Sequence, residues 1–153
     1  MIESQHPVTI CACDGVLARG EAGEVYINSV LATTERCWFT VHITVRAHQH
    51  DAFGDLQTWR EESVAQFRPS GHGLYDLRLE IDGAPVELDS GRGNGGGMDD
   101  ESRQVHWTQS LVFPIRPSQR AARLTLSWEA MGLSGHHVID LAHVARSVVA
   151  GAY

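Results

Sequence analysis

Two of the nine histidines stand in the stretch His48-Gln49-His50-Asp51, which has the residue types of a metal site. The sequence before it alternates like a β-strand, and residues two apart in a strand point to the same side. His48, His50 and Asp51 could therefore ligate one metal ion through imidazole and carboxylate groups, with His72, His136 or His137 as further ligands. No complete metal motif is present. A solvated polar strand end would have the same composition, so both interpretations stay open.

Two other stretches carry groups with possible chemistry. Cys11 and Cys13 lie two residues apart and could bind Zn or Cu, or could be small buried apolar residues. The stretch of residues 89–101 contains Gly91, Gly93 and Gly96 at the spacing of a dinucleotide-binding turn. That turn needs a helix after it, with an N-terminus that binds the pyrophosphate. Here acidic residues and a strand-like pattern follow, so we predict a connector between strands and no nucleotide site.

Tryptophan gives the clearest indication of a contact surface. Trp38 lies on the polar side of its predicted strand, together with Thr40, His42 and Thr44. An aromatic side chain on that side is typical of a sheet face that binds a protein partner, a sugar or a second subunit. Trp59, in a segment of mixed pattern, could serve the same purpose. Coverage of Trp38 by another part of the chain is the alternative.

Strict alternation of apolar and polar residues dominates the rest of the chain. It covers residues 37–46, 75–81 and 123–129, with a weaker set from Trp107 to Phe113 that Gln109 interrupts. Such a period predicts strands with one buried face. Asp82-Gly83 predicts a two-residue hairpin turn, and Asp140 predicts the cap of a helix that ends at Gly151.

These patterns predict an all-β protein. We expect an antiparallel β-sandwich of about seven or eight strands with a short C-terminal helix, and a β-barrel is the alternative. The length of 153 residues predicts a single domain over residues 1–153.

Charge narrows the classes of partner. The formal net charge is −7, there is no Lys, and the arginines form no cluster. We therefore expect no nucleic-acid partner and no membrane partner, because both need clustered cations or long apolar segments. The three cysteines and the absence of a signal-peptide pattern predict a cytoplasmic protein.

The order of these features resembles a known group of proteins. Asp82-Gly83 precedes a Gly-rich stretch, then a Trp-containing strand over residues 107–117, and finally a Trp strand that leads through a Gly turn to an Ala-rich helix. This order, over residues 24–150, is similar to a family of uncharacterised small actinobacterial proteins. The chain departs from it at Glu129-Ala130 and His136-His137. The resemblance implies a β-sandwich in the cytoplasm; the family has no assigned activity, so no catalytic residue is implied.

Three functions therefore remain open from the sequence. We favour a non-enzymatic protein that acts through protein–protein contacts or self-association, with no cofactor. A metal-binding protein or metal-dependent hydrolase that uses His48, His50 and Asp51 is the alternative. A small-ligand or carbohydrate-binding module is a second alternative, because many β-sandwiches have that function.

Overall fold

The computed structural model describes residues 6–10, 13–46, 76–99, 104–128 and 132–151. These residues form two antiparallel β-sheets and one helix, so the predicted all-β sandwich is confirmed and the alternative of a closed barrel is wrong. The described part holds ten strands, more than the seven or eight predicted. The strand at residues 15–20 and the strand in the glycine-rich stretch at residues 89–99 account for the excess, because neither was predicted.

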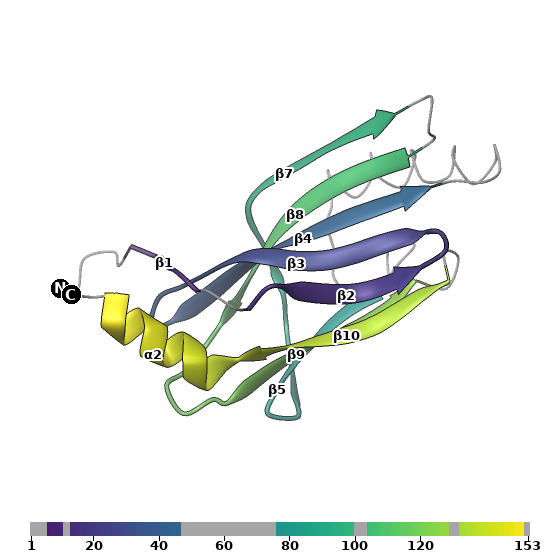
Figure 1. The fold of residues 1–153 in the computed structure, drawn as a ribbon. Helices are drawn as coiled ribbons and strands as arrows, with labels where there is room; N and C mark the ends of the chain where they lie inside the picture. Colours follow the sequence, from purple (N-terminus) through teal and green to yellow (C-terminus); the bar gives the residue numbers. More distant parts are fainter. Residues whose placement is uncertain (1–5, 11–12, 47–75, 100–103, 129–131, 152–153) are drawn as a thin grey trace.

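The first sheet has six strands and is called sheet A here (Figure 1). It is built around three long strands, β3 (Gly23–Ala32), β4 (Arg36–Arg46) and β8 (Gln104–Pro114). β7 (Asp89–Asp99) pairs with β8 at one edge. At the other edge β3 pairs with both β1 (Val8–Thr9) and β2 (Gly15–Gly20).

The second sheet has four strands and is called sheet B. Its order is β10 (Leu133–Asp140), β9 (Ala121–Trp128), β5 (Asp76–Ile81) and β6 (Ala84–Val86). The turn between β5 and β6 is Asp82-Gly83, as predicted, with φ angles of 50° and 87°. Positive φ at both positions is the requirement of a type I′ turn, which Asp and Gly tolerate. The Asp82 carboxylate also accepts the backbone N–H groups of Arg120 and Ala121.

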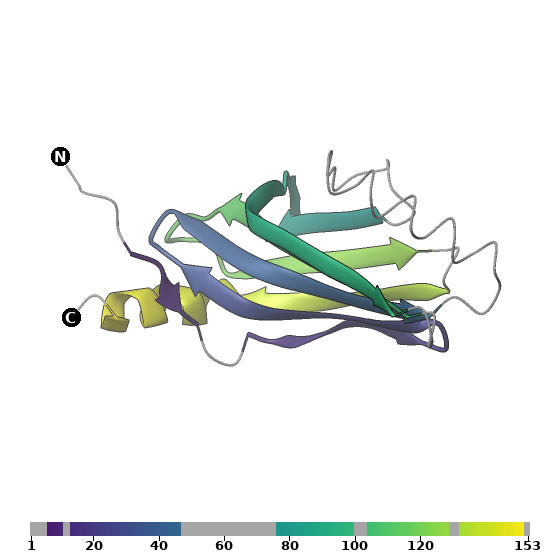
Figure 2. The same ribbon diagram turned by 90° about the horizontal axis from the view of Figure 1, so that it is seen from above.

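The core is the layer of side chains between the two sheets (Figure 2). The predicted alternation is confirmed, because Phe39 of β4, Phe113 of β8 and Trp128 of β9 are all buried. The rings of Phe39 and Phe113 lie 6.0 Å apart at a tilt of 59°. Gln109 does not interrupt β8. It takes an inward position between Val41 and Asn94 and is fully buried, so the polar residue occurs within a regular strand.

The glycine-rich stretch is the main difference from the sequence prediction. Residues 89–99 are not a connector but the strand β7, which pairs with β8 from Asn94↔Gln109 to Asp99↔Gln104. A register shift lies between Ser90 and Asn94. Glycine has low strand propensity, but its backbone can still extend where a long neighbouring strand offers hydrogen bonds. Tertiary pairing therefore overrides the local preference.

The helix α2 (Leu141–Gly151) agrees with the sequence prediction. Asp140 accepts the backbone N–H groups of Ala142 and His143 at 3.0 and 3.1 Å, which caps the helix. Leu141, Val144 and Val148 are buried, and Gly151 packs against Val8 of β1. The helix thus covers one end of the sandwich (Figure 1). Within the described residues, no helix is long and apolar enough to cross a bilayer.

One side of the sandwich is covered where β2 of sheet A lies beside β10 of sheet B (Figure 1). The backbones approach so closely that a Cβ atom on Gly135 would overlap the carbonyl oxygen of Leu17. A Cβ atom on Gly15 would meet the imidazole of His137, whose Nε2 donates to the Cys13 carbonyl at 2.9 Å. Gly135 is therefore needed for the two sheets to meet at this side, because its neighbour is backbone, whereas at Gly15 the His137 side chain could move.

The close contact between β2 and β10 leads to a prediction about stability. Gly135→Ala is expected to lower the free energy of unfolding by about 1–3 kcal/mol, because the added methyl forces two backbones apart. Urea unfolding measures the effect, with Ser134→Ala at the exposed neighbouring position as the control. Equal stability of the two variants would show that β2 and β10 are not in close contact.

Candidate functional site

The outer face of sheet A, the face turned away from sheet B, carries the side chains of interest. The strand register arranges them in rows across β3, β4 and β8. An apolar row contains Leu31, Trp38 and Val112, and an aromatic row contains Tyr26, His42 and Thr108. Asn28, Thr40 and Ser110 form a polar row between these two. Directly opposed residues of an antiparallel pair lie on the same face, so each row is a set of neighbours.

The apolar row places Trp38 as the sequence predicted. Its neighbours on β4, Cys37 and Phe39, are fully buried in the core, so Trp38 itself points away from the core. Trp38 is half-buried, with Leu31 opposite it on one side and Val112 on the other. The three side chains form a compact apolar area on a face that is otherwise polar.

The aromatic row is held together by stacking and one hydrogen bond. The rings of Tyr26 and His42 are parallel within 5°, with centroids 4.6 Å apart. Nε2 of His42 lies 2.7 Å from Oδ1 of Asn28. An amide oxygen only accepts, so this bond makes Nε2 the protonated nitrogen of the neutral ring. Nδ1 is then an acceptor, and it is buried without a hydrogen-bond partner among the described residues.

His106 of β8 is the second imidazole on this face. Its ring centroid lies 6.1 Å from that of His42, and its Nδ1 lies 3.0 Å from the hydroxyl of Thr44. Burial lowers the pKa of His42 below its usual value, and repulsion from His106 lowers this pKa further. The His42 ring is therefore neutral at pH 7 and serves as a packing and hydrogen-bonding group.

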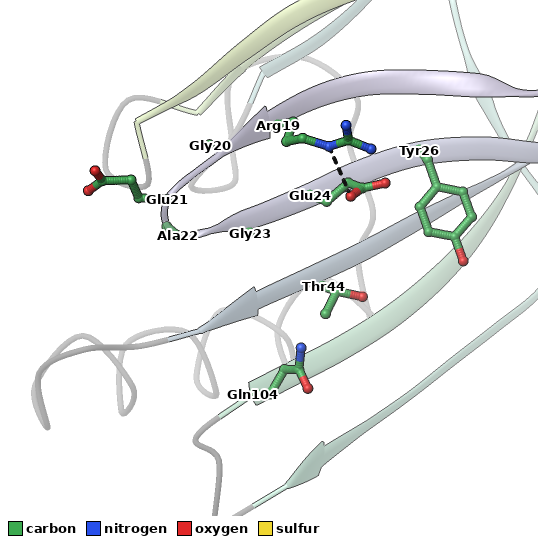
Figure 3. A pocket seen from close by; sticks show the side chains of 9 residues that line it. All are labelled: Arg19, Gly20, Glu21, Ala22, Gly23, Glu24, Tyr26, Thr44 and Gln104. Atoms are coloured by element: carbon green, nitrogen blue, oxygen red, sulfur yellow. Dashed lines mark hydrogen bonds and ion pairs between the residues drawn. The ribbon is translucent and has the colours of Figure 1, made fainter.

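A broad hollow of about 550 Å³ lies at the end of the face near the β2–β3 turn. Its lining residues come from β2, β3, β4 and β8 and from the turn between β2 and β3 (Figure 3). Arg19 and Glu24 form an ion pair of 3.2 Å there, and Tyr26, Thr44 and Gln104 lie on the same face. The Arg19 side chain is 66% exposed and the Glu24 side chain 37% exposed, so water screens the pair and it contributes little to stability. What the hollow offers is a set of hydrogen-bonding groups beside an aromatic ring.

Other sequence-predicted site residues lie elsewhere. His48, His50, Asp51 and Trp59 are outside the described residues, and the metal site and the second Trp contact stay predictions. Among the residues that the structure describes, no group of three His, Cys, Asp or Glu side chains could hold a metal ion. Of the suggested further ligands, His136 is exposed and His137 bonds the Cys13 carbonyl.

Two of the three cysteines lie within the described residues. Cys11 is outside the described residues, whereas Cys13 and Cys37 are buried free thiols. Burial raises the pKa of Cys37 to about 12, and the nearby Cys13 adds to this rise. The Cys37 thiol therefore stays protonated at neutral pH and acts as a small core residue, as its position in the alternating pattern predicted.

Sequence reasoning missed Tyr26, Asn28 and His106 as parts of one surface. Each has an ordinary position in its own strand, and only the register of β3 with β4 and of β4 with β8 brings them together. The alternating patterns could have indicated that they face outward. They could not have indicated which residues are neighbours.

Comparison with known proteins adds no further information on this face. No protein-family model matches the sequence, and no curated protein or solved structure is significantly similar to it. The resemblance to an actinobacterial family therefore stays a prediction.

The imidazole pair yields a pH prediction. We expect His42 to titrate below the usual histidine pKa of about 6.5, and His106→Gln to raise this pKa by removing a like charge. NMR titration of the imidazole resonances measures both effects, with the remote His136→Gln as the control. Titration of His42 at or above the usual value would contradict the burial and the repulsion described here.

The lowered pKa of His42 also determines how the stability of the protein changes with pH. The unfolded chain binds a proton at His42 more readily than the folded protein does, so protonation favours unfolding. The contribution of neutral His42 to the free energy of unfolding is complete above about pH 6.5. It is lost as the pH falls toward the pKa of His42 in the folded protein. His42→Asn should remove this part of the pH dependence in urea unfolding at about pH 7 and pH 5. An unchanged pH dependence in His42→Asn would contradict the assignment.

Proposed function

We propose that this protein is a non-enzymatic cytoplasmic β-sandwich that acts through protein–protein contacts. The outer face of sheet A is the contact surface in this proposal. The observation that supports it most is the half-buried Trp38, which lies between Leu31 and Val112 on a face turned away from the core.

The distribution of side chains on the face fits a protein interface. Such interfaces have an aromatic or apolar centre with a polar rim, and Trp is enriched among the residues that dominate binding. Here the apolar row is followed by Asn28, Thr40 and Ser110 in the next row, and then by the Tyr26–His42 stack. These groups can form hydrogen bonds with a partner while Trp38, Leu31 and Val112 lose water.

The shape of the face favours a protein over a small molecule. Small-ligand sites are concave, enclosed and mostly apolar. The hollow beside Tyr26 is broad, and its lining includes Arg19, Glu24 and Gln104. A second protein can cover an open polar surface of this kind together with the apolar row. The small-ligand or carbohydrate-binding module, the second alternative, would use the same aromatic row as its binding element.

Site-specific photo-crosslinking in the native host cells tests the proposal. A photoreactive phenylalanine derivative replaces Thr40, in the middle of the face, or Thr125, at an exposed position on the outer face of sheet B. We expect a discrete cross-linked protein species from position 40 and none from position 125. Adding Trp38→Ala should lower its yield about tenfold or more, the effect of losing a dominant contact residue. Thermal unfolding confirms that each variant is folded.

Two outcomes would contradict the proposal. One is equal cross-linking from the two positions, since contact would then not depend on sheet A. The other is cross-linking from position 40 that Trp38→Ala leaves unchanged. A species of twice the chain mass would identify the partner as a second copy.

A further inference from the structure

The strand β7 is an edge strand with properties that differ from those of the other sheet edges. It has eleven residues and pairs only with β8 among the described residues. A strand paired on one side presents a row of backbone N–H and C=O groups on the other side, and such a row can bind another strand. Most proteins therefore protect such edges from pairing with another chain.

The other edges are protected in known ways. β1 has two residues, and β6 has three residues, one of which is Pro85. Short length and proline both prevent the addition of a further strand. β2 and β10 lie against each other, as the contact between Gly135 and the Leu17 carbonyl shows.

β7 is neither short nor paired on its second side among the described residues, and its one irregularity, the register shift between Ser90 and Asn94, leaves the rest of the strand regular. The strand contains no proline, and the whole chain lacks lysine, the charged residue most often used to protect edges. Five of the seven residues from Gly91 to Gly97 are glycine and have no side chain that could shield the backbone. The register shift ends at Asn94, so the segment from Asn94 to Asp99 pairs regularly and is the part that can accept a strand.

We propose that the free edge of β7 pairs antiparallel with β7 of a second copy of this chain. The glycines argue for a second copy over a foreign peptide. Recognition of a peptide by strand addition gains its specificity from pockets for alternate side chains, and a run of glycines provides none. A two-fold pairing centred on Gly96 needs only backbone groups, and it places Gly95 opposite the partner's Gly97. Two-fold dimers are also the commonest homo-oligomers.

This dimer would extend sheet A into one continuous sheet across both copies. The two-fold axis of an antiparallel strand pair is perpendicular to the sheet, so both outer faces point the same way. The two copies of Trp38 then lie on one surface. The inference does not depend on the proposed function, since the edge and the face involve different residues and either can fail alone.

A charge-exchange experiment tests the pairing. Gly95 and Gly97 lie opposite Thr108 and His106, so substitutions there project from the outer face and leave the core unchanged. One variant carries Gly95→Lys and Gly97→Lys, and the other carries Gly95→Glu and Gly97→Glu. In the dimer each would place like charges opposite each other, which disfavours pairing. A mixture of the two variants would place opposite charges there.

Sedimentation velocity and native mass spectrometry provide the measurement. We expect the wild-type protein to dimerise, each variant alone to dimerise at least about fivefold more weakly, and the mixture to form the heterodimer. Formation of the heterodimer shows that both variants fold. Ala84→Lys, at the exposed β6 edge, is the matched control and should leave the dimer unchanged.

Three results would overturn the inference. The first is a wild-type protein that stays monomeric up to about 1 mM. The second is a dimer that neither double variant weakens. The third is a mixture that forms no heterodimer although both variants unfold cooperatively.

Discussion

The apolar layer shared by the two sheets is the constraint on which the rest of the structure depends. Each core strand places alternate residues in this layer, with Phe39, Phe113 and Trp128 among its largest members. The same alternation sends the remaining residues of each strand outward. The position of Trp38 and His42 on an outer face is thus a direct consequence of the burial of Cys37, Phe39, Val41 and Ile43 on the inner one.

The two sheets differ in what their outward residues are. On β9 of sheet B the outward positions are exposed and are filled by Arg123, Thr125 and Ser127. On β4 of sheet A they are half-buried, and Trp38 and His42 occupy two of them. Large side chains on three neighbouring long strands shield one another, so the face is ordered by its own stacking and hydrogen bonds. Because these side chains are already ordered, they lose little conformational entropy when a partner binds.

Much of this architecture could be predicted from the sequence, because the signals are local. The alternating strands, the Asp82-Gly83 turn and the Asp140 cap each depend on a few adjacent residues. β7 could not be predicted, since glycine has no preference for strands and the pairing with β8 is a tertiary effect. The outward position of Trp38 was predictable from its strand, but its neighbours Leu31 and Val112 were not, because they depend on register.

The two sides of the sandwich therefore differ in how their strand edges are covered. Close backbone contact at Gly135 covers one side, whereas β7 forms the edge of sheet A at the other. The proposed contact face depends on the outer face of sheet A being open, and the proposed dimer depends on the edge at β7 being open.

Residue-resolved amide hydrogen exchange at low and high protein concentration tests most directly whether the β7 edge is open in a single copy and covered in the dimer. At low concentration the account predicts alternating fast and slow amides in β7, because successive N–H groups of a strand point to opposite edges. At high concentration the fast amides should become slow. Uniform slow exchange along β7 at a concentration where the protein is monomeric would contradict the account, because the edge would then be covered within a single chain.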